Sequence, residues 1–344
     1  MVYQYPTNEA PSFGRHIDLT PIAVNVLKQS NVAAGDRLVI YADNERNKAQ
    51  IDAFFIAGEI VGAETLLAMT TPRNNPRDPS RVALDAMSNA HTIIDLSCAS
   101  WIYTSPFSQL LEQGTRILSS MTNPDTWAKL PPDPQLSSIS HRSAEIIEST
   151  ETMRVWSAAG SDFTVQKHGR MGTWQDGLLG EPGDWDNFPS HQAACAPLED
   201  SAEGVMVISP GDLLVQTKQV VSSEIRLTLK GGRIVKIDGG SDAALLRKWF
   251  ARWNDPNAYI MSHIGWGLEP RAEIASMQMM EWESFGGNIM VAFGANDGRF
   301  LGGTTHSRAH LDIILLEAGY SCDETIILEG GQFQLSELEL PTFA

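Results

Sequence analysis

Cysteine and long apolar runs are both scarce in this sequence. The three cysteines lie far apart at Cys98, Cys195 and Cys322, an arrangement that fits neither a disulfide framework nor a zinc knuckle. No stretch reaches the roughly 18 consecutive apolar residues of a membrane-spanning helix, and residues 1–7 lack the basic end and apolar run of a signal peptide. We therefore expect a cytoplasmic protein that keeps its thiols reduced and does not contact membranes.

Positive charge is also in short supply. The 344 residues include 42 acidic and only 25 basic side chains, which gives a formal net charge of −17. Because a protein that binds nucleic acid needs clustered Lys and Arg to displace the counterions of the phosphates, this balance argues against nucleic acid as a partner. The length of 344 residues predicts two domains. Hydrophobic residues make up 42% of the chain, including 9 Trp and 12 Phe, which is enough to give these domains substantial cores.

The first 125 residues alternate short apolar runs with amphipathic ones. This pattern predicts strands at 35–42, 64–70, 92–96 and 116–120, separated by helices at 48–61, 81–89 and 106–114. Such alternation is typical of an open parallel sheet, so residues 1–125 are predicted to be an α/β domain. No Gly-x-Gly-x-x-Gly or Walker loop follows a strand, and residues 43–47 are acidic where a dinucleotide phosphate would lie. This domain is therefore expected to be a scaffold, an oligomer surface or a pocket wall.

The composition changes after this domain. Pro, Asp and Ser dominate residues 123–138, which predicts a linker over 126–145. Beyond it, residues 146–344 are predicted to be a β-rich domain, with strands at 154–158, 162–166, 205–208 and 213–217, a hairpin over 225–237 and one helix over 243–253. The predicted fold class is α/β, in which an N-terminal parallel α/β domain precedes a β-rich α+β metal-binding domain.

The segment from His310 to Leu316 carries the strongest functional signal. The aliphatic residues after Asp312 predict a buried strand, on which residues two apart project from the same face, so His310 and Asp312 point into one space. One more histidine facing that space would complete a two-His-one-carboxylate metal site. His263 is the best candidate, because Gly265 and Gly267 follow it and allow a close approach of backbone and ligand. A polar pair at a strand edge is the ordinary alternative.

Two other metal sites are less consistent with the sequence. His306 and His310 are four residues apart, as in a zinc-binding helix, but Ser307 replaces the general-base Glu and the surrounding residues favour turn and strand. A closed structural zinc site would add a fourth ligand, usually Cys, and no cysteine is near in sequence. In 2-oxoglutarate oxygenases, His-x-Asp usually precedes the distal His, which is the reverse of the order found here. An open triad of this kind is the arrangement with which ferrous oxygenases bind substrate and dioxygen together.

The remaining histidines differ in their surroundings. His191 lies in a turn-rich segment, where solvated loop residues and functional residues are both common, so it is a candidate site residue. His168 lies just past a predicted strand. His16, His91 and His141 fall in scaffold or linker positions and are not assigned a role.

Five segments together resemble the thermophilic aminopeptidase T family of metallopeptidases. They are Asn187-Phe188-Pro189, Ala196-Pro197-Leu198-Glu199-Asp200-Ser201, Gly160-Ser161-Asp162, Gly265-Trp266-Gly267-Leu268-Glu269-Pro270 and His310-Leu311-Asp312. The resemblance covers most of the chain, and it implies a parallel α/β domain followed by a metal-bearing β-rich domain.

The departures from that family are as informative as the matches. In its peptidases, glutamate ligands occupy the positions that here are Gln192 and His263, and a ligand histidine is replaced by Met290. Only His310 and Asp312 keep their types, so the chain cannot hold two carboxylate-bridged ions but can hold one. This substitution pattern resembles the non-peptidase branch of the family, the 2,5-dihydroxypyridine 5,6-dioxygenases of aerobic nicotinate breakdown, which bind one ferrous ion with two His and one Asp.

The resemblance implies a ring-cleaving dioxygenase that uses Fe(2+) and O2 to open 2,5-dihydroxypyridine to N-formylmaleamate. We expect His191, or else His306, to be the acid/base, since imidazole titrates near neutrality. His168 and Trp266 are expected to contact substrate. The resemblance and the apolar residues 101–103 favour a homo-oligomer. A metal-dependent aminopeptidase and a catalytically silent binding scaffold are the alternatives.

Overall fold

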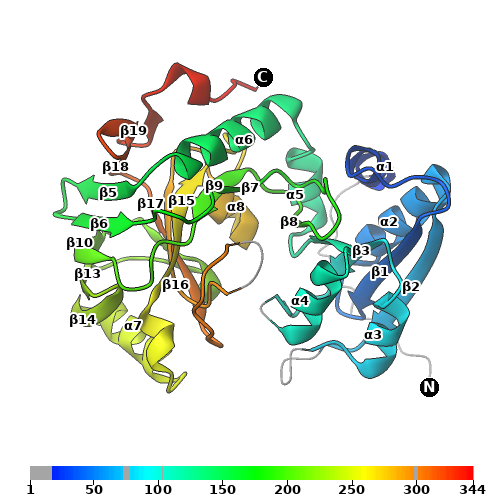
Figure 1. Ribbon diagram of the computed structural model, residues 1–344, viewed down its shortest axis with the longest axis horizontal. Coiled ribbons are helices and arrows are strands. Elements are labelled where there is room, and N and C mark those ends of the chain that lie inside the picture. The colour runs from blue at the N-terminus through cyan, green and yellow to red at the C-terminus, as the bar shows by residue number, and fades with distance from the viewer. Residues whose placement is uncertain (1–17, 73–77, 103, 298–300, 344) are drawn as a thin grey trace.

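The structure is a computed structural model that describes residues 18–72, 78–102, 104–297 and 301–343. His16 and Tyr103 lie outside these residues. One half of the molecule is a parallel sheet with its helices, and the other half consists of two antiparallel sheets (Figure 1). Within the described residues, no helix combines the length and the apolar character needed to cross a membrane.

The N-terminal half is built on a five-stranded parallel sheet of order β2-β1-β3-β4-β8. Its strands are β1 (Arg37–Asp43), β2 (Glu64–Thr70), β3 (Thr92–Leu96), β4 (Arg116–Ser119) and β8 (Trp185–Asn187). Its helices are α1 (Thr20–Gln29), α2 (Lys48–Val61), α3 (Arg81–Met87) and α4 (Ser105–Glu112). The predicted alternation is confirmed, and the boundaries of α2 have a local cause. Asn47 accepts a hydrogen bond from the Ala49 N–H at the start, and Gly62 takes a left-handed conformation at the end.

The predicted linker is largely helical. Most of residues 126–145 fall in α5 (Pro124–Lys129) and α6 (Pro134–Glu148), which both begin with a proline. Proline is tolerated at the first helical position because its missing N–H would have no partner there, and Asn123 and Asp133 cap the two helices with their side chains. The Pro- and Asp-rich composition therefore marks helix starts and not an unstructured connection.

The two halves also interleave more than the predicted boundaries suggest. Strand β8 comes from the middle of the chain but pairs with β4, so the parallel sheet takes its last strand from beyond residue 125. Trp101 and Ile102, the described residues of the apolar segment 101–103, do not form an exposed patch. Trp101 is buried in the core of this half, and Ile102 lines a cavity described below, so this segment provides no evidence for an oligomer surface.

The C-terminal half contains two antiparallel sheets. The eight-stranded sheet consists of β14 (Arg233–Gly239), β13 (Ile225–Lys230), β10 (Glu203–Ile208), β6 (Asp162–Gln166), β5 (Thr152–Ser157), β18 (Ala318–Cys322), β19 (Thr325–Glu329) and β20 (Gln332–Phe333). The seven-stranded sheet consists of β12 (Gln219–Val220), β11 (Leu213–Leu214), β17 (His310–Leu315), β16 (Ile289–Gly294), β15 (Met261–Gly267), β9 (Gln192–Cys195) and β7 (Thr173–Gln175). Helices α7 (Ser241–Ala251) and α8 (Met279–Ser284) complete this half, with short 3-10 turns at Val215–Thr217, Pro256–Tyr259, Ile274–Ser276 and Ser336–Leu338. The predicted hairpin, formed by β13 and β14, and the predicted high strand content of this half are confirmed.

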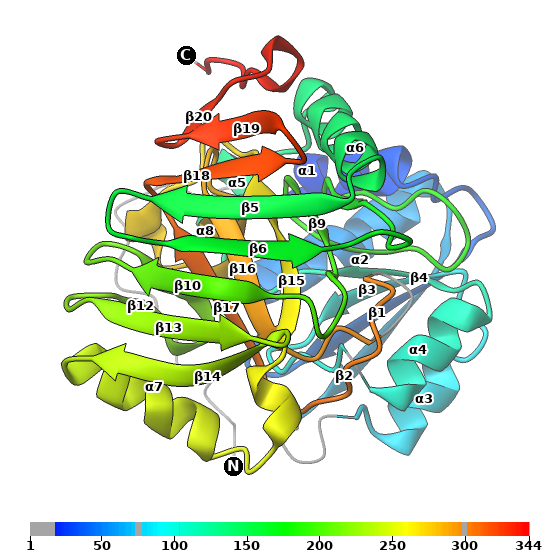
Figure 2. The same cartoon turned by 60° about the vertical axis from the view of Figure 1, so that its left-hand side comes forward.

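The main core lies between these two sheets. Figure 2 shows the eight-stranded sheet in front of β15, β16 and β17. Alternate residues of both sheets, such as Val155 and Phe163 from one and Ile264 and Leu311 from the other, form one buried apolar cluster. The opposite face of the seven-stranded sheet is therefore the only face of that sheet left to carry a site.

Candidate metal centre

Successive side chains of β17 point to opposite faces of the sheet, and this separates the proposed ligands from the core residues. Leu311 and Ile313 belong to the core cluster, so His310 and Asp312 project from the other face of the sheet. His263 comes from β15, which is separated from β17 by β16. The pairing of β15 with β16 shifts register between Met261 and Ile264, so His263 lies at an irregularity of the kind that re-aims side chains beside functional sites.

The three side chains converge on one point. Nε2 of His263 lies 3.0 Å from Oδ1 of Asp312 and 3.3 Å from Nε2 of His310, and Nε2 of His310 lies 3.4 Å from Oδ2 of Asp312. One ligand atom from each residue falls within 4.8 Å of the others. Among the described residues this is the group of His, Cys, Asp and Glu side chains that could hold a metal ion.

The hydrogen bonds around the triad suit a cation. Nδ1 of His310 lies 2.9 Å from the Ala295 carbonyl, which can only accept, so this nitrogen carries the proton and Nε2 offers a lone pair. Oδ1 of Asp312 is buried and accepts no hydrogen bond from any described residue. Two imidazoles and an unsatisfied carboxylate oxygen thus face one another at close range, and a bound cation would satisfy all three.

The electrostatics of the triad point the same way. Burial lowers the pKa of His263, which favours the neutral imidazole that ligates metals. Burial acts to raise the pKa of Asp312, but His310 and His263 outweigh it and hold that pKa well below its usual range. The site therefore offers an ionised carboxylate at Asp312 and a neutral imidazole at His263.

Gln216 contacts Asp312 and was not singled out from the sequence. It lies in the 3-10 turn after β11, where its side-chain oxygen accepts the Asp312 N–H at 2.7 Å and its amide donates to Oδ2 of Asp312. The residue thus fixes the orientation of the ligating carboxylate. Only the antiparallel pairing of β11 with β17 brings Gln216 to Asp312, so no local sequence signal indicates it.

We expect Gln216→Met to weaken metal binding by about 10-fold to 100-fold, the usual effect of losing a residue that orients a ligand. Titration of the metal-free protein with ferrous ion under anaerobic conditions measures the affinity. Gln219→Met, a change of the same type in β12, is the matched control and should leave the affinity unchanged. Equal affinity for the two variants would show that Gln216 does not support the metal centre.

The triad opens into a cavity of about 530 Å³ between the two halves of the molecule. The parallel half contributes Ser100, Ile102, Met121, Trp185 and Asn187, which confirms that it provides a pocket wall. Gln192 and Met290, at which the family resemblance led us to expect no metal ligand, also line this cavity. Gln192 donates to the side-chain oxygen of Gln175, so an amide pair forms this part of the wall.

Glu283 is the other acidic residue of the cavity. It projects from α8 and is 9% exposed, and no described residue forms a hydrogen bond or ion pair with its carboxyl group. Burial, with a further contribution from the charge of Asp312, raises the pKa of Glu283 well above its usual value. An unpartnered carboxyl group beside a metal triad is suited to proton exchange with a bound ligand.

Trp266 does not reach the cavity, which corrects the expectation that it contacts substrate. Strand β15 alternates, so Ile264 and Trp266 enter the core between the sheets while His263 faces the other way. The Trp266 side chain is fully buried, and its indole N–H donates to Oγ of Ser143 on α6 at 3.1 Å.

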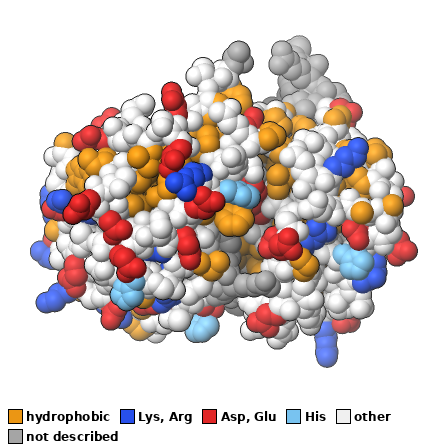
Figure 3. All heavy atoms as spheres, turned by 45° about the horizontal axis from the view of Figure 1, so that its top comes forward, with side chains coloured by type: hydrophobic (Ala, Val, Ile, Leu, Met, Phe, Trp, Pro, Cys, Tyr) orange, Lys and Arg blue, Asp and Glu red, His pale blue; other side chains and the backbone are white. Residues whose placement is uncertain are grey.

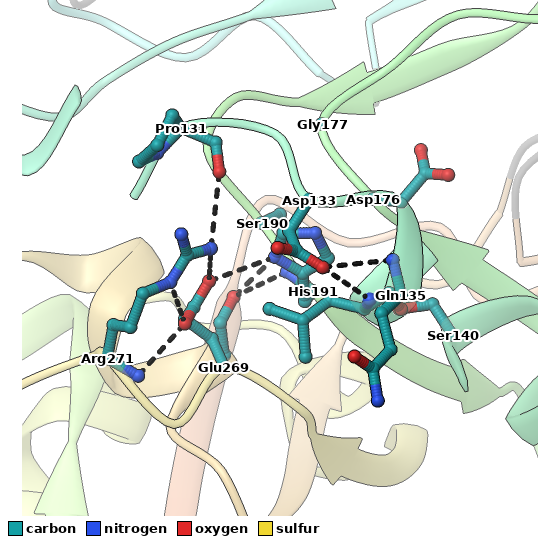
Figure 4. Close-up of polar contacts among 12 residues, drawn as sticks. Pro131, Asp133, Gln135, Ser140, Asp176, Gly177, Ser190, His191, Glu269 and Arg271 are labelled. Atoms are coloured by element: carbon teal, nitrogen blue, oxygen red, sulfur yellow. Dashed lines mark hydrogen bonds and ion pairs between the residues drawn. The ribbon is translucent and has the colours of Figure 1, made fainter. Parts of the chain in front are cut away.

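His191 is also placed away from the cavity, although the sequence favoured it as the acid/base. Gln192 lines the cavity, so the preceding residue points to the opposite side of β9, where it is almost fully buried. Its Nδ1 contacts a carboxylate oxygen of Glu269 at 3.1 Å, and Arg271 holds the same carboxylate from the other side at 2.7 and 2.8 Å (Figure 4). Arg271 also donates to the Pro131 carbonyl, so this network ties the turn before α6 to the β-rich half.

His168 and His306 both lie on the surface. The His168 side chain is 59% exposed and lies 3.8 Å from Glu151. The His306 side chain is 83% exposed, with its Nδ1 2.6 Å from Asp297. Neither residue is part of the cavity wall, so the structure supports neither the substrate-binding role expected for His168 nor the acid/base role considered for His306.

The Glu269 network predicts a pH-dependent stability. Burial acts to raise the pKa of Glu269, but hydrogen bonds from His191 and Arg271 outweigh it and lower the pKa to about 2. Because the folded-state pKa is depressed, the stabilisation is fully present above the unfolded-state value of about 4.3 and is lost as the pH falls toward 2.

We therefore expect the metal-free protein to lose more free energy of unfolding between pH 5 and pH 3 than its Glu269→Gln variant, by about 1.5 kcal/mol. Denaturant unfolding at each pH measures the difference. Glu64→Gln, which changes an exposed carboxylate, should retain the wild-type slope. Parallel pH profiles for wild type and Glu269→Gln would contradict the proposed charge network.

The fold and the triad together define a class of protein, namely an α/β metalloprotein with an open two-His-one-carboxylate centre beside a ligand cavity. The sequence profile of the NicX, 2,5-dihydroxypyridine 5,6-dioxygenase, family matches residues 18–335. The chain belongs to this family.

Individual proteins agree with the family match. The chain is 34% identical over 231 residues to the 2,5-dihydroxypyridine 5,6-dioxygenase of Pseudomonas putida KT2440, a match that covers 64% of this chain and 65% of the relative. A solved structure of 2,5-dihydroxypyridine dioxygenase from Pseudomonas putida KT2440 superimposes with a TM-score of 0.86 at 27% identity, covering 93% of this chain and 98% of that one. AmpT from Thermus thermophilus shares the fold, with a TM-score of 0.60 at 13% identity over 92% of this chain and 99% of that chain.

Proposed function

We propose that this protein is an Fe(2+)-dependent dioxygenase that cleaves the ring of 2,5-dihydroxypyridine between carbons 5 and 6. The convergence of His263, His310 and Asp312 on one face of the seven-stranded sheet, open to a ligand cavity, is the observation that carries the proposal. Family membership supports the substrate and the reaction. Three ligands on one side of an octahedral ion leave positions for substrate and dioxygen, which is the arrangement of non-haem ferrous oxygenases.

The reaction balances without any further reactant. Dioxygen supplies both oxygen atoms, the bond between carbons 5 and 6 breaks, carbon 5 becomes a carboxyl carbon and carbon 6 becomes an N-formyl group. The product is N-formylmaleamate. Bound iron supplies the redox chemistry that allows dioxygen to react with an electron-rich ring.

The residues of the cavity supply binding and proton transfer. Trp185, Met280 and Met290 form apolar walls against which a flat heterocycle can pack. Glu283 takes the proton of the substrate hydroxyl group and returns it to the product. We assign the acid/base role to Glu283 because it lines the cavity, whereas His191 and His306 do not. Gln216 keeps Asp312 in its ligating orientation throughout.

The proposal is tested by anaerobic loading with ferrous ion, followed by oxygen-uptake and peptidase assays. We expect one O2 consumed for each 2,5-dihydroxypyridine lost, with N-formylmaleamate as the product, and no hydrolysis of amino-acid amides. Peptide hydrolysis without oxygen uptake would support the aminopeptidase instead. A protein that is inactive in both assays although it binds iron would indicate a binding scaffold.

The protein is also proposed to be cytoplasmic. Cys195 and Cys322 are buried free thiols and Cys98 is an exposed one, which is consistent with a reducing cytoplasm. On the face drawn in Figure 3, basic side chains are scattered among acidic ones and form no continuous band. We propose that the protein acts as a homo-oligomer on a small molecule, and sedimentation of the purified protein would measure its subunit number.

A further inference from the structure

Two arginines stand out among the residues that line the cavity. Arg252 and Arg308 are its only Lys or Arg residues within the described chain, and both are exposed to solvent. No described carboxylate pairs with either guanidinium. Some exposed arginines of this acidic protein pair with a carboxylate, as Arg154 does with Asp162 at 2.8 Å, and others, such as Arg81 and Arg233, pair with no described carboxylate. Arg252 and Arg308 differ from the latter because both line the same cavity, to which they bring two positive charges that no described carboxylate neutralises.

Arg252 is held in place by aromatic rings. It follows α7, and its guanidinium carbon lies 5.1 Å from the ring centre of Trp249 and 4.9 Å from that of Trp253. Both tryptophans line the cavity, and their indole N–H groups are buried without an acceptor among the described residues. Stacking on aromatic faces fixes the plane of a guanidinium but leaves its N–H groups free for an anion.

Arg308 is aligned with the metal ligands. Ala309 is buried in the core between the sheets, so Arg308 and His310 on either side of it face the cavity. Two residues of chain span at most about 7 Å, so the backbone of Arg308 lies no farther than that from the backbone of His310.

We propose that Arg252 and Arg308 form a carboxylate-binding subsite in the cavity that also holds the three candidate metal ligands. A guanidinium matches a carboxylate with two parallel hydrogen bonds, which a lysine cannot do. This inference rests on the proposed function, which supplies two sources of a carboxylate. Ring opening creates one on the product, and a substrate ring could carry one as a substituent.

The test uses maleamate as a stable stand-in for the product and maleamide as its uncharged counterpart. Quenching of tryptophan fluorescence reports binding without turnover, because Arg252 lies against two indoles. We expect the iron-loaded protein to bind maleamate more tightly than maleamide. Arg308→Gln and Arg252→Gln should each weaken maleamate binding by about 10-fold to 100-fold, the range for a charge-assisted hydrogen bond, and leave maleamide binding unchanged. Added salt should reduce the difference, because both arginines are exposed.

Arg226→Gln is the matched control, since Arg226 lies on β13 of the eight-stranded sheet and does not line the cavity.

The source of the carboxylate is decided by comparing kcat/KM for 2,5-dihydroxypyridine and for the same ring with a carboxylate at carbon 3. A preference for the substituted ring that Arg308→Gln abolishes assigns the subsite to substrate, whereas inhibition by maleamate with no such preference assigns it to product.

The outcomes of this test separate the subsite from the proposed reaction. Ring cleavage with maleamate binding that is equal in Arg308→Gln, Arg252→Gln and Arg226→Gln would overturn the subsite and leave the reaction intact. Arginine-dependent maleamate binding by a protein that cleaves no dihydroxypyridine would keep the subsite and overturn the reaction.

Discussion

Replacing any one of His263, His310 and Asp312 with alanine is expected to abolish both iron binding and ring cleavage while the chain stays folded. Each residue supplies one of only three protein ligands, so its loss should cost more than the roughly 10-fold to 100-fold that follows from losing a residue that only orients a ligand. Iron content after anaerobic loading, oxygen uptake and thermal unfolding should be measured on the same samples.

His306→Ala is the matched control for these variants. It is also a histidine-to-alanine change in the segment that leads into β17, but the side chain is 83% exposed and lies outside the cavity. It should keep full iron and full turnover. If a triad variant retained its iron and activity to the same degree as His306→Ala, the assignment of that residue as a ligand would be wrong.

Glu283→Gln is expected to slow turnover by about 10² to 10⁴, the usual contribution of a positioned acid/base, while the protein retains one iron per chain. The substitution keeps the shape of the side chain but removes its ability to exchange a proton with the substrate hydroxyl group. Single-turnover oxygen uptake, with iron measured in parallel, separates this effect from loss of metal.

Glu273→Gln provides the comparison, because Glu273 is an exposed carboxylate outside the cavity. Normal turnover in Glu283→Gln would show that Glu283 is not the acid/base and that its role is structural. Loss of iron in the same variant would instead make Glu283 part of the metal centre. His191→Gln offers a further contrast, since its expected effect is on unfolding through Glu269 and not on the chemical step.

The candidate metal centre could be predicted because its signal is local. A period of two along β17 is enough to place His310 and Asp312 on the same face, and this prediction is confirmed. His263 was predicted for a different reason, namely the need for a second histidine and the glycines that follow it, and its role as a metal ligand stays a prediction. The contact of His263 with the other two ligands depends on the pairing of β15, β16 and β17, which no single segment encodes.

The acid/base and substrate residues could not be predicted in the same way. His191 and Gln192 are neighbours, yet one is buried against Glu269 and the other lines the cavity. Which of two adjacent residues faces a site depends on the register of a strand in its sheet, and a shift of one residue reverses the outcome. The turn-rich sequence around His191 indicates a loop, but it does not indicate on which face of the sheet the His191 side chain lies.

The sequence by itself determined the alternation of strands and helices between residues 35 and 120, the β-rich character of the other half and the common orientation of His310 and Asp312 on β17, because hydrophobic periodicity and short-range spacing act along the chain. Only the tertiary structure decided that β8 completes the parallel sheet, that Gln216 and Glu283 stand beside Asp312, and that Arg252 and Arg308 share one cavity. These contacts join residues that are distant in sequence. They arise because each sheet must bury one apolar face, and the packing that achieves this selects which polar side chains meet on the other.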